Sequence, residues 1–229
     1  MASGTKKSPN PLTARSGPAR GTVIGIVAVV LFAGLVGFGV YQAQKPADVV
    51  VPPNATAAGV PVGNPAAKAT IDIYQDFQCP ACKQFEDMSG QTVDQLVAGR
   101  QAKVVYHPVA ILDRTSPDRY SSRSSAASAC AAADNVFPQY LKLLYANQPT
   151  EGDPGLTPEQ LTSLGQQAGA GPGFAECVSS DRYAGWTASL TDQASKDGLA
   201  ATPTVKVNGQ QVQNPTPDAL RAAVSAAQA

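Results

Sequence analysis

The stretch that decides the fold lies about one third of the way along the chain and reads Asp76-Phe77-Gln78-Cys79-Pro80-Ala81-Cys82-Lys83-Gln84-Phe85. An alternating apolar pattern, Ile71 to Phe77, leads into it and predicts a β-strand. Apolar residues at helical spacing, Phe85, Met88, Val93, Leu96 and Val97, lead out of it, and Gly99 ends this run. The two cysteines therefore lie at a predicted junction between a strand and a helix.

This position of the cysteine pair favours thiol–disulfide exchange. If Cys79 caps the helix and Pro80 opens it, the Cys79 sulfur lies beside unpaired backbone N–H groups at the positive end of the helix dipole. A thiolate is stabilised there, so we expect the pKa of the Cys79 thiol to fall. Cys82, in the first turn, is within reach to resolve a mixed disulfide. Cys79 and Cys82 are therefore the predicted catalytic residues.

Two structural alternatives for Cys79 and Cys82 are a static disulfide and half of a zinc site. A zinc site needs a second pair of ligands, but the chain holds no other CxxC and no HxxxH. Its only histidine is His107, which lies in a predicted strand and is expected to be structural. We therefore predict no metal site.

The charge of the chain is unevenly distributed, although its formal net charge is zero. Before residue 42 the only charged residues are basic: Lys6, Lys7, Arg15 and Arg20. From residue 62 onward there are 12 basic and 16 acidic residues, which leaves this part with a net charge of −4. An acidic domain is a poor binder of nucleic acid, so no nucleic-acid partner is expected.

The segment 22–41 carries no charged residue and is long enough to span a bilayer core of about 30 Å. The basic segment before it predicts a cytoplasmic tail at 1–21, so the rest of the chain is expected outside the membrane. The alternative is a cleaved signal peptide followed by secretion. Both interpretations place the folded part in an oxidising compartment. Residues 42–61 lack periodicity and are expected to form a linker.

The folded domain is predicted at 62–229. A second strand is expected within 103–112, with Pro108 at an edge or ending its ladder early. Residues 117–200 show almost no strand signal and predict a block of about four helices. A hairpin follows at 202–212 around Asn208-Gly209, and Thr216-Pro217 begins a last helix. This order predicts an α/β sheet with an inserted helical domain.

Cys130 and Cys177 both lie in the helical block, away from any CxxC. We expect one structural disulfide between them, and the loss of loop entropy in the unfolded chain would give it a stabilisation of about 4 kcal/mol. The alternative is a second redox pair. Asp76 and Gln78 flank the cysteine pair and are expected to shape its electrostatics, although Asp76 is equally consistent with a solvated loop charge. Trp186 is expected in the core.

The order of elements, with a cysteine pair after the first clear strand, resembles the thioredoxin fold. The helical insertion and the sequence Asp-Phe-Gln-Cys-Pro-x-Cys make the chain similar to the DsbA-like thiol:disulfide oxidoreductases over about residues 60–229. Three pieces carry the likeness: Gly63-Asn64-Pro65 leading into Ile71–Phe85, the segment Ala201-Thr202-Pro203-Thr204-Val205, and the turn Val207-Asn208-Gly209.

The resemblance implies a thioredoxin-like fold with an inserted helical domain, and the uncharged segment 22–41 predicts a transmembrane helix before it. The resemblance implies that Pro203 is a cis-proline facing Cys79 and that Thr202, with Pro80 and Ala81, contacts substrate. It further implies disulfide formation in secreted proteins and a membrane redox partner that recycles the cysteine pair. No cofactor is implied.

Two departures from the family pattern change the expected chemistry: Ala81 lowers the expected oxidising strength, and Ile73 leaves the usual proton relay without its buried acid. Strongly oxidising members carry His before the second cysteine, where this chain has Ala81, and many carry a buried acid at the position of Ile73. The neighbouring Asp72 points to the other face of the strand. A disulfide reductase or isomerase, and a non-enzymatic membrane-tethered redox sensor or interaction domain, therefore remain as alternative functions.

Overall fold

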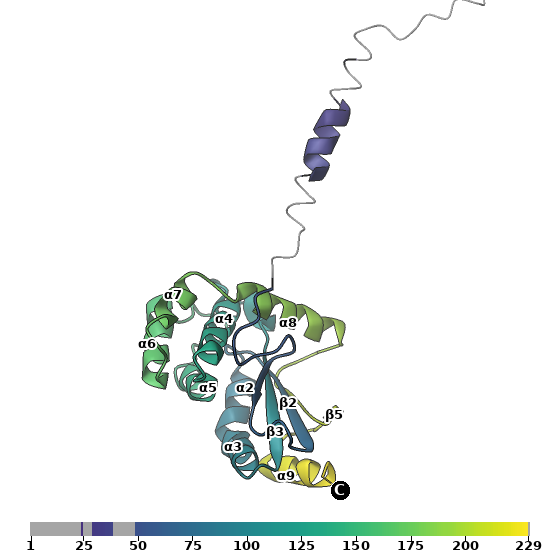
Figure 1. Cartoon of the computed structure of the whole chain (residues 1–229), viewed down its shortest axis with the longest axis vertical. Helices are drawn as coiled ribbons and strands as arrows, with labels where there is room; N and C mark the ends of the chain where they lie inside the picture. Colours follow the sequence, from purple (N-terminus) through teal and green to yellow (C-terminus); the bar gives the residue numbers. More distant parts are fainter. Residues whose placement is uncertain (1–23, 25–28, 39–48, 229) are drawn as a thin grey trace, which may run out of the picture. The chain divides into compact units, whose positions relative to one another are not determined.

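The computed structural model describes residue 24, residues 29–38 and residues 49–228 (Figure 1). The chain divides into two compact units, Met1–Ala47 and Asp48–Ala229. Within the predicted membrane anchor, residue 24 and residues 29–38 are helical, while the rest of the anchor, the predicted tail at 1–21 and residues 42–48 lie outside the described residues. None of the helices in the described part of the chain combines the length and the apolar character needed to cross a membrane.

One mixed sheet organises the second unit. Its strand order is β1-β3-β2-β4-β5, with β2 and β3 parallel and every other neighbouring pair antiparallel. The strands are β1 (Val60–Val62), β2 (Ala69–Gln75), β3 (Ala102–Pro108), β4 (Thr204–Val207) and β5 (Gln210–Gln211). The expected hairpin around Asn208-Gly209 is the connection between β4 and β5. The strand expected within 103–112 is β3, and it ends at Pro108 because proline has no backbone N–H to continue the ladder.

The helix that follows the cysteine pair is interrupted. It comprises α2 (Pro80–Phe85), a π-helical turn η2 (Glu86–Gly90) and α3 (Gln91–Ala98). A π turn inserts an extra residue into the helical repeat, so it rotates the apolar face of α3 relative to that of α2. Met88, expected on the buried face, lies in η2 itself and is 47% exposed.

The helical insertion lies between β3 and β4. It begins with a short 3₁₀ turn, η3 (Ile111–Arg114), and continues with α4 (Tyr120–Ala133), α5 (Phe137–Ala146), α6 (Pro158–Ala168), α7 (Phe174–Ser179) and α8 (Ala184–Lys196). The structure thus has five α-helices in the described segment 117–200, where about four were expected. The extra one is α7, which is only six residues long and gives a weak sequence signal.

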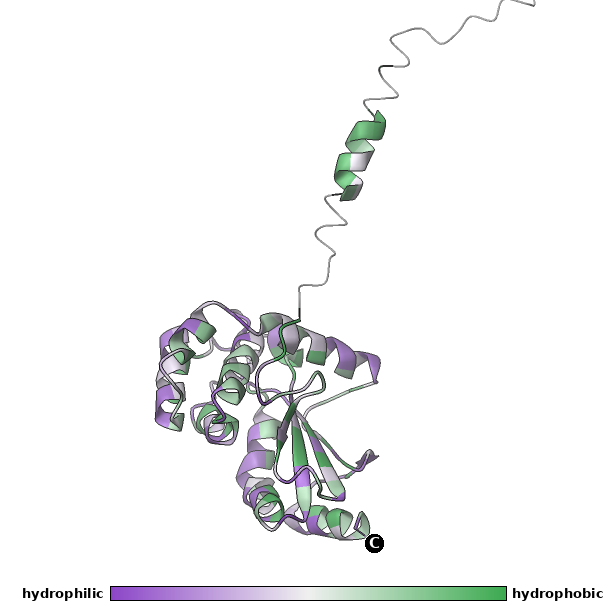
Figure 2. Ribbon diagram, in the orientation of Figure 1, coloured by the Kyte–Doolittle hydropathy of each residue, from purple (hydrophilic) through white to green (hydrophobic). Residues whose placement is uncertain are grey.

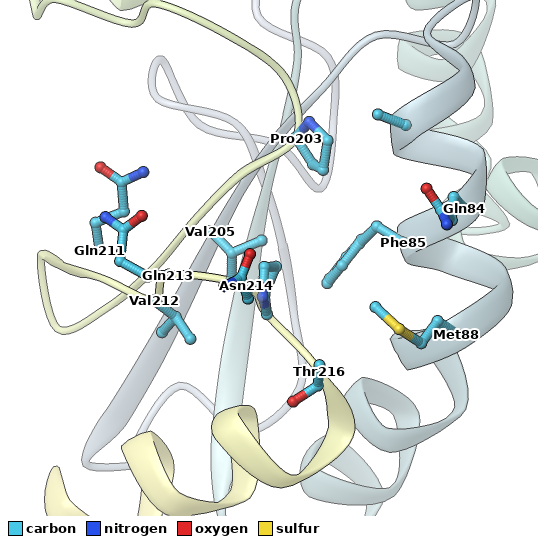
Figure 3. Close-up of a pocket in the computed structure, with 12 residues that line it drawn as sticks. Gln84, Phe85, Met88, Pro203, Val205, Gln211, Val212, Gln213, Asn214 and Thr216 are labelled. Atoms are coloured by element: carbon cyan, nitrogen blue, oxygen red, sulfur yellow. The ribbon is translucent and has the colours of Figure 1, made fainter.

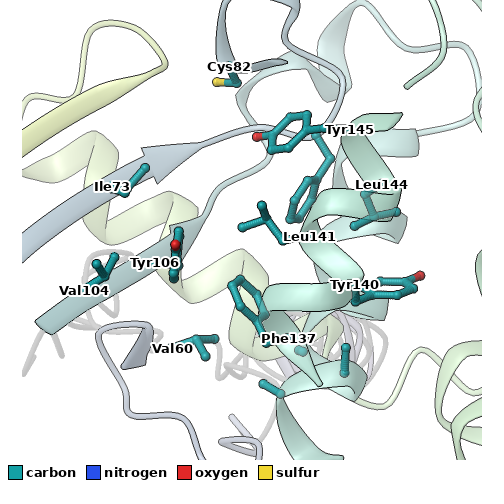
Figure 4. Close-up of a cluster of buried hydrophobic side chains, with 14 of the residues drawn as sticks. Val60, Ile73, Cys82, Val104, Tyr106, Phe137, Tyr140, Leu141, Leu144 and Tyr145 are labelled. Atoms are coloured by element: carbon teal, nitrogen blue, oxygen red, sulfur yellow. The ribbon is translucent and has the colours of Figure 1, made fainter. Parts of the chain in front are cut away.

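The core lies between the sheet and this insertion. The alternation of β2 buries Ile71 and Ile73, and Figure 4 shows Ile73 and Tyr106 of the sheet facing Phe137 and Leu141 of α5. The central strands are coloured mainly as hydrophobic in Figure 2. Trp186 is fully buried, as expected. The last helix, α9 (Pro217–Ala226), packs against α3 and β2.

The expected linker at 42–61 is wrong for its described part. Residues 49–61 belong to the compact unit, and β1 begins at Val60 instead of after the predicted boundary at 62. The indole N–H of Trp186 donates to the carbonyl oxygen of Thr56 at 2.9 Å, and the Asn54 side chain donates to that of Ala132 at 3.2 Å. These contacts come from residues far away in the sequence, so local patterning could not reveal them.

Candidate active site

The strand–helix junction holds Cys79 and Cys82 in the predicted arrangement. Cys79 has extended backbone angles and is the N-cap of α2, with Pro80 as the first helical residue. The backbone N–H groups of Cys82 and Lys83 donate to the Cys79 carbonyl oxygen at 3.1 and 3.2 Å. Both cysteines are free thiols in this structure. The local sequence alone, an extended cap followed by proline, is enough to begin the helix here.

The two thiols differ in exposure and acidity. Cys79 is 8% exposed and Cys82 only 1%. The Cys82 thiol and, more weakly, Thr202 and the backbone N–H groups of Cys82 and Ala81 stabilise the Cys79 thiolate, and against the opposing effect of burial they lower the pKa of Cys79 to about 6. Burial raises the pKa of Cys82 well above its ordinary value. One thiol is therefore prepared to be a thiolate and its neighbour to stay protonated.

The segment that precedes β4 closes the other side of the site. The peptide bond between Thr202 and Pro203 is cis. The Cys79 thiol lies 3.4 Å from the carbonyl oxygen of Thr202, to which it can donate. Ala81 is exposed beside this contact. The tertiary structure thus brings the expected positions Pro80, Ala81, Thr202 and Pro203 to one place, around the Cys79 sulfur.

A cavity of about 450 Å³ continues from this place along the surface (Figure 3). One wall carries Phe85 and Met88, and the other carries Pro203, Val205 and Asn214. Amide side chains, those of Gln84, Gln211 and Gln213, add polar groups to the lining. The cavity can therefore receive a segment with both apolar and hydrogen-bonding groups.

Asp76 is buried and is not a solvated loop charge. Its carboxylate accepts hydrogen bonds from the backbone N–H groups of Gln78 and Leu112, at 2.9 and 3.0 Å, and from the Ser121 hydroxyl at 2.7 Å. Burial nevertheless raises its pKa. The backbone N–H of Asp76 donates to the Cys82 sulfur at 3.5 Å. Asp76 therefore ties the junction to η3 and α4, while its own peptide group contacts the buried thiol.

His107 and the second cysteine pair lie away from the dithiol. His107 Nε2 is 2.9 Å from the Asp72 carboxylate, and the imidazole stacks on Tyr74 with ring centroids 4.0 Å apart. Cys130 of α4 and Cys177 of α7 form a disulfide. In the described part of the chain no group of three or more His, Cys, Asp or Glu side chains is arranged to hold a metal ion.

Sequence reasoning missed one residue of the site altogether. Gln148, just after α5, donates its side-chain amide to the carbonyl oxygens of Phe77 and Cys79, both at 3.0 Å. Nothing in the local pattern around a loop glutamine indicates a contact with a segment some 70 residues earlier. Such contacts are set by the docking of the insertion on the sheet.

The sheet is thioredoxin-like, and two thiols at the N-terminus of a helix face a loop with a cis-proline. This combination defines the class of thiol–disulfide oxidoreductases. A family model described as thioredoxin matches residues 55–226. The chain belongs to this family and, within it, is an enzyme of the DsbA type.

Two solved structures carry the finer assignment. Reduced DsbA from Mycobacterium tuberculosis is 31% identical with a TM-score of 0.64, and the match covers 76% of this chain and 90% of that one. The reduced disulfide bond oxidoreductase DsbG of the same organism is 32% identical with a TM-score of 0.65, covering 82% and 90%.

A curated relative is matched over only part of its length. The serine/threonine-protein kinase PknE of Mycobacterium tuberculosis is 33% identical over 145 residues, which is 60% of this chain. The chain spans about a quarter of the length of this kinase, since the match covers 26% of it.

Proposed function

We propose that the protein is an exported, membrane-anchored dithiol oxidase that forms disulfides in secreted proteins, with Cys79 as nucleophile and Cys82 as resolving thiol. The observation that carries the proposal is the asymmetry of the two thiols. The pKa of Cys79 is lowered to about 6, whereas that of Cys82 is raised. A stabilised thiolate makes the reduced form favourable, which is the property of a dithiol that oxidises its partners.

The reaction runs through a mixed disulfide. A substrate thiolate attacks the Cys79 sulfur of the Cys79–Cys82 disulfide, and the bond between the two enzyme sulfurs breaks. Cys82 leaves as a thiolate and takes up a proton, as its raised pKa favours. A second substrate thiolate then attacks the substrate sulfur, and Cys79 leaves as a thiolate. The substrate loses two electrons and the enzyme gains them.

The loop around Pro203 would bind the substrate. The Thr202 backbone lies against the Cys79 sulfur, so an extended substrate segment can pair with it while its cysteine reaches Cys79. The cavity below Pro203 would then take the residues that flank this cysteine. A membrane redox partner would reoxidise the reduced pair, because each turnover leaves the enzyme with two thiols.

Export and anchoring rest on the sequence of the N-terminal part. A basic stretch precedes the uncharged segment 22–41, which fits an uncleaved anchor with the enzyme on the extracytoplasmic side, or a signal peptide. The disulfide between Cys130 and Cys177 supports this location, because structural disulfides persist in oxidising compartments.

A reductase is the second function to weigh, and Ala81 favours it. A histidine at that position would add a cation beside the Cys79 thiolate, and alanine adds none. The pKa of Cys79, about 6, lies between the values near 7 of thioredoxin and near 3.5 of strong oxidants. The two functions therefore differ in the reduction potential of one and the same dithiol.

The test combines the potential with a refolding assay. Equilibration with glutathione should give a potential of about −120 to −180 mV, whereas about −270 mV would establish a reductant. The oxidised enzyme should restore activity to a reduced, unfolded protein that needs disulfides. Cys79→Ser should abolish this activity, and a Cys79→Ser variant that still catalyses refolding would contradict the proposed role of Cys79.

A further inference from the structure

Two glutamines join the active-site turn to the helical insertion. Gln78 immediately precedes Cys79 and is completely buried. Gln148 is half-buried in the segment 147–157, which connects α5 to α6. Each of these side chains donates to backbone carbonyls of the segment that carries the other, so the two contacts are reciprocal.

The geometry of this pair leaves little freedom. Gln148 Nε2 lies 3.0 Å from the carbonyl oxygens of both Phe77 and Cys79. Gln78 Nε2 lies 3.1 Å from the carbonyl oxygen of Asp153 and 3.5 Å from that of Thr150. Because all four acceptors are carbonyl oxygens, only the amino end of each side-chain amide can face them. The orientation of both amides follows from this chemistry.

Gln148 holds the peptide group that begins the catalytic helix. The Cys79 carbonyl oxygen already accepts the backbone N–H groups of Cys82 and Lys83, which form the first turn of α2. The bond from Gln148 is its third. Because the Cys79 Cα carries both this carbonyl group and the thiol-bearing side chain, fixing the carbonyl also restricts where the Cys79 sulfur lies.

The end of α5 supports the same turn through a second side chain. The Tyr145 ring packs against Phe77 with centroids 5.4 Å apart, and its hydroxyl lies 3.5 Å from the carbonyl oxygen of Asp76. Gln148 follows Tyr145 by less than one helical turn. The end of α5 thus reaches the backbone of the junction at Asp76, Phe77 and Cys79.

We propose that Gln148 and Gln78 are positioning residues for thiol–disulfide exchange, which hold the Cys79 sulfur at the first turn of α2 by fastening the junction to the insertion. The inference rests on the proposed role of Cys79 as nucleophile. It gives the segment 147–157 a part in the chemistry, although no side chain of this segment needs to touch the substrate.

The test replaces Gln148 by methionine, which has similar length, carries no charge and donates no hydrogen bond. The matched control is Gln139→Met, at an exposed position of α5. In the reduced full-length protein, the pH dependence of alkylation gives the pKa of Cys79. Gln148→Met should raise this pKa by about half to one pH unit, the value of one or two hydrogen bonds. The control should keep the wild-type pKa.

Equilibration with glutathione supplies a second readout. If the pKa of Cys79 rises from about 6 to about 7, the equilibrium at pH 7 shifts about fivefold away from the reduced form. The variant is then less oxidising. Because both glutamines hold the same two segments, the double variant with Gln78→Met should shift the potential by less than the sum of the single variants.

A purely structural role would give a different result. Gln148→Met would then lower the melting temperature but keep the wild-type pKa and potential, and this outcome overturns the inference. If Gln148→Met does not fold, Gln148→Ala carries the same test, because it removes the donors without adding a charge beside Cys79. Failure of the wild-type enzyme to exchange disulfides would instead count against the proposed function.

Discussion

The Cys79 sulfur lies 3.4 Å from the carbonyl oxygen of Thr202, a residue 123 positions further along the chain. The contact joins the N-terminal cap of α2 to the segment just before β4. The cap follows β2 in the chain, and β2 and β4 are neighbours in the sheet. A thiol in this position can donate to the carbonyl, and a substrate strand can pair with the same backbone. The backbone available to a substrate strand therefore lies directly against the Cys79 sulfur.

The hydrogen bond from the Cys82 thiol is the largest influence that lowers the pKa of Cys79. Cys82→Ala removes this donor, so the pKa of Cys79 should rise toward the ordinary range. Cys82→Ser keeps an O–H donor and should keep most of the lowering. Alkylation of Cys79 across a pH series, followed by mass spectrometry, measures its pKa in the two variants. Equal pKa values in both variants would contradict the role given to the Cys82 thiol.

Reactivity of the reduced enzyme should depend on pH with a midpoint near 6, the pKa of Cys79. This pKa lies below the ordinary value of 9.0, so ionised Cys79 stabilises the folded, reduced protein. The stabilisation is complete above pH 9 and is lost as pH falls through 6. Melting temperatures of reduced wild type and Cys79→Ser should therefore diverge between pH 6 and pH 9. Parallel curves over this range would show that the thiolate is not stabilised by folding.

Ala81→His should make the enzyme more oxidising. A partly protonated imidazole at this exposed position adds positive charge beside the Cys79 thiolate, so the pKa of Cys79 should fall and the potential should rise. Tenfold stabilisation of the reduced form corresponds to about 30 mV. Equilibration with glutathione measures the change, and Ala81→Asn is the uncharged control. A potential that rises as much with Asn as with His would rule out the charge as its cause.

The disulfide between Cys130 and Cys177 should contribute stability without redox function. It joins α4 to α7 across a sequence separation of 47 residues, for which the loop-entropy model gives about 4 kcal/mol. The double variant Cys130→Ala/Cys177→Ala should lose roughly 2–5 kcal/mol in free energy of unfolding, measured by urea denaturation. The potential of the Cys79/Cys82 pair should stay at the wild-type value. A shifted potential would mean that the two pairs communicate.

Features that depend on residues close together in the sequence were predictable. Cys79 caps α2 ahead of Pro80, Thr216 caps α9 ahead of Pro217, and Asn208-Gly209 turns the last hairpin. Each depends on residues within one or two turns, where side-chain type and spacing determine the backbone. The redox class of the site followed from such local signals, because a cysteine at a helix N-terminus is acidic for local reasons.

Features that depend on contacts between residues far apart in the sequence were not predictable. The folded unit begins before the predicted boundary at 62, because residues of the insertion hold Thr56 and Asn54. The local pattern permits both an electrostatic role and a solvated charge for Asp76, whereas the structure buries it and joins it to Ser121, 45 residues further along the chain. Gln148 was not singled out at all.

The sequence by itself therefore determined the kind of chemistry at Cys79 and Cys82, since a cap, a proline and a two-residue spacing suffice for it. Only the tertiary structure decided which distant groups surround the two sulfurs. Thr202 and Gln148 reach the junction from the loop before β4 and from the end of α5. Their contacts depend on packing between elements, which no local pattern encodes.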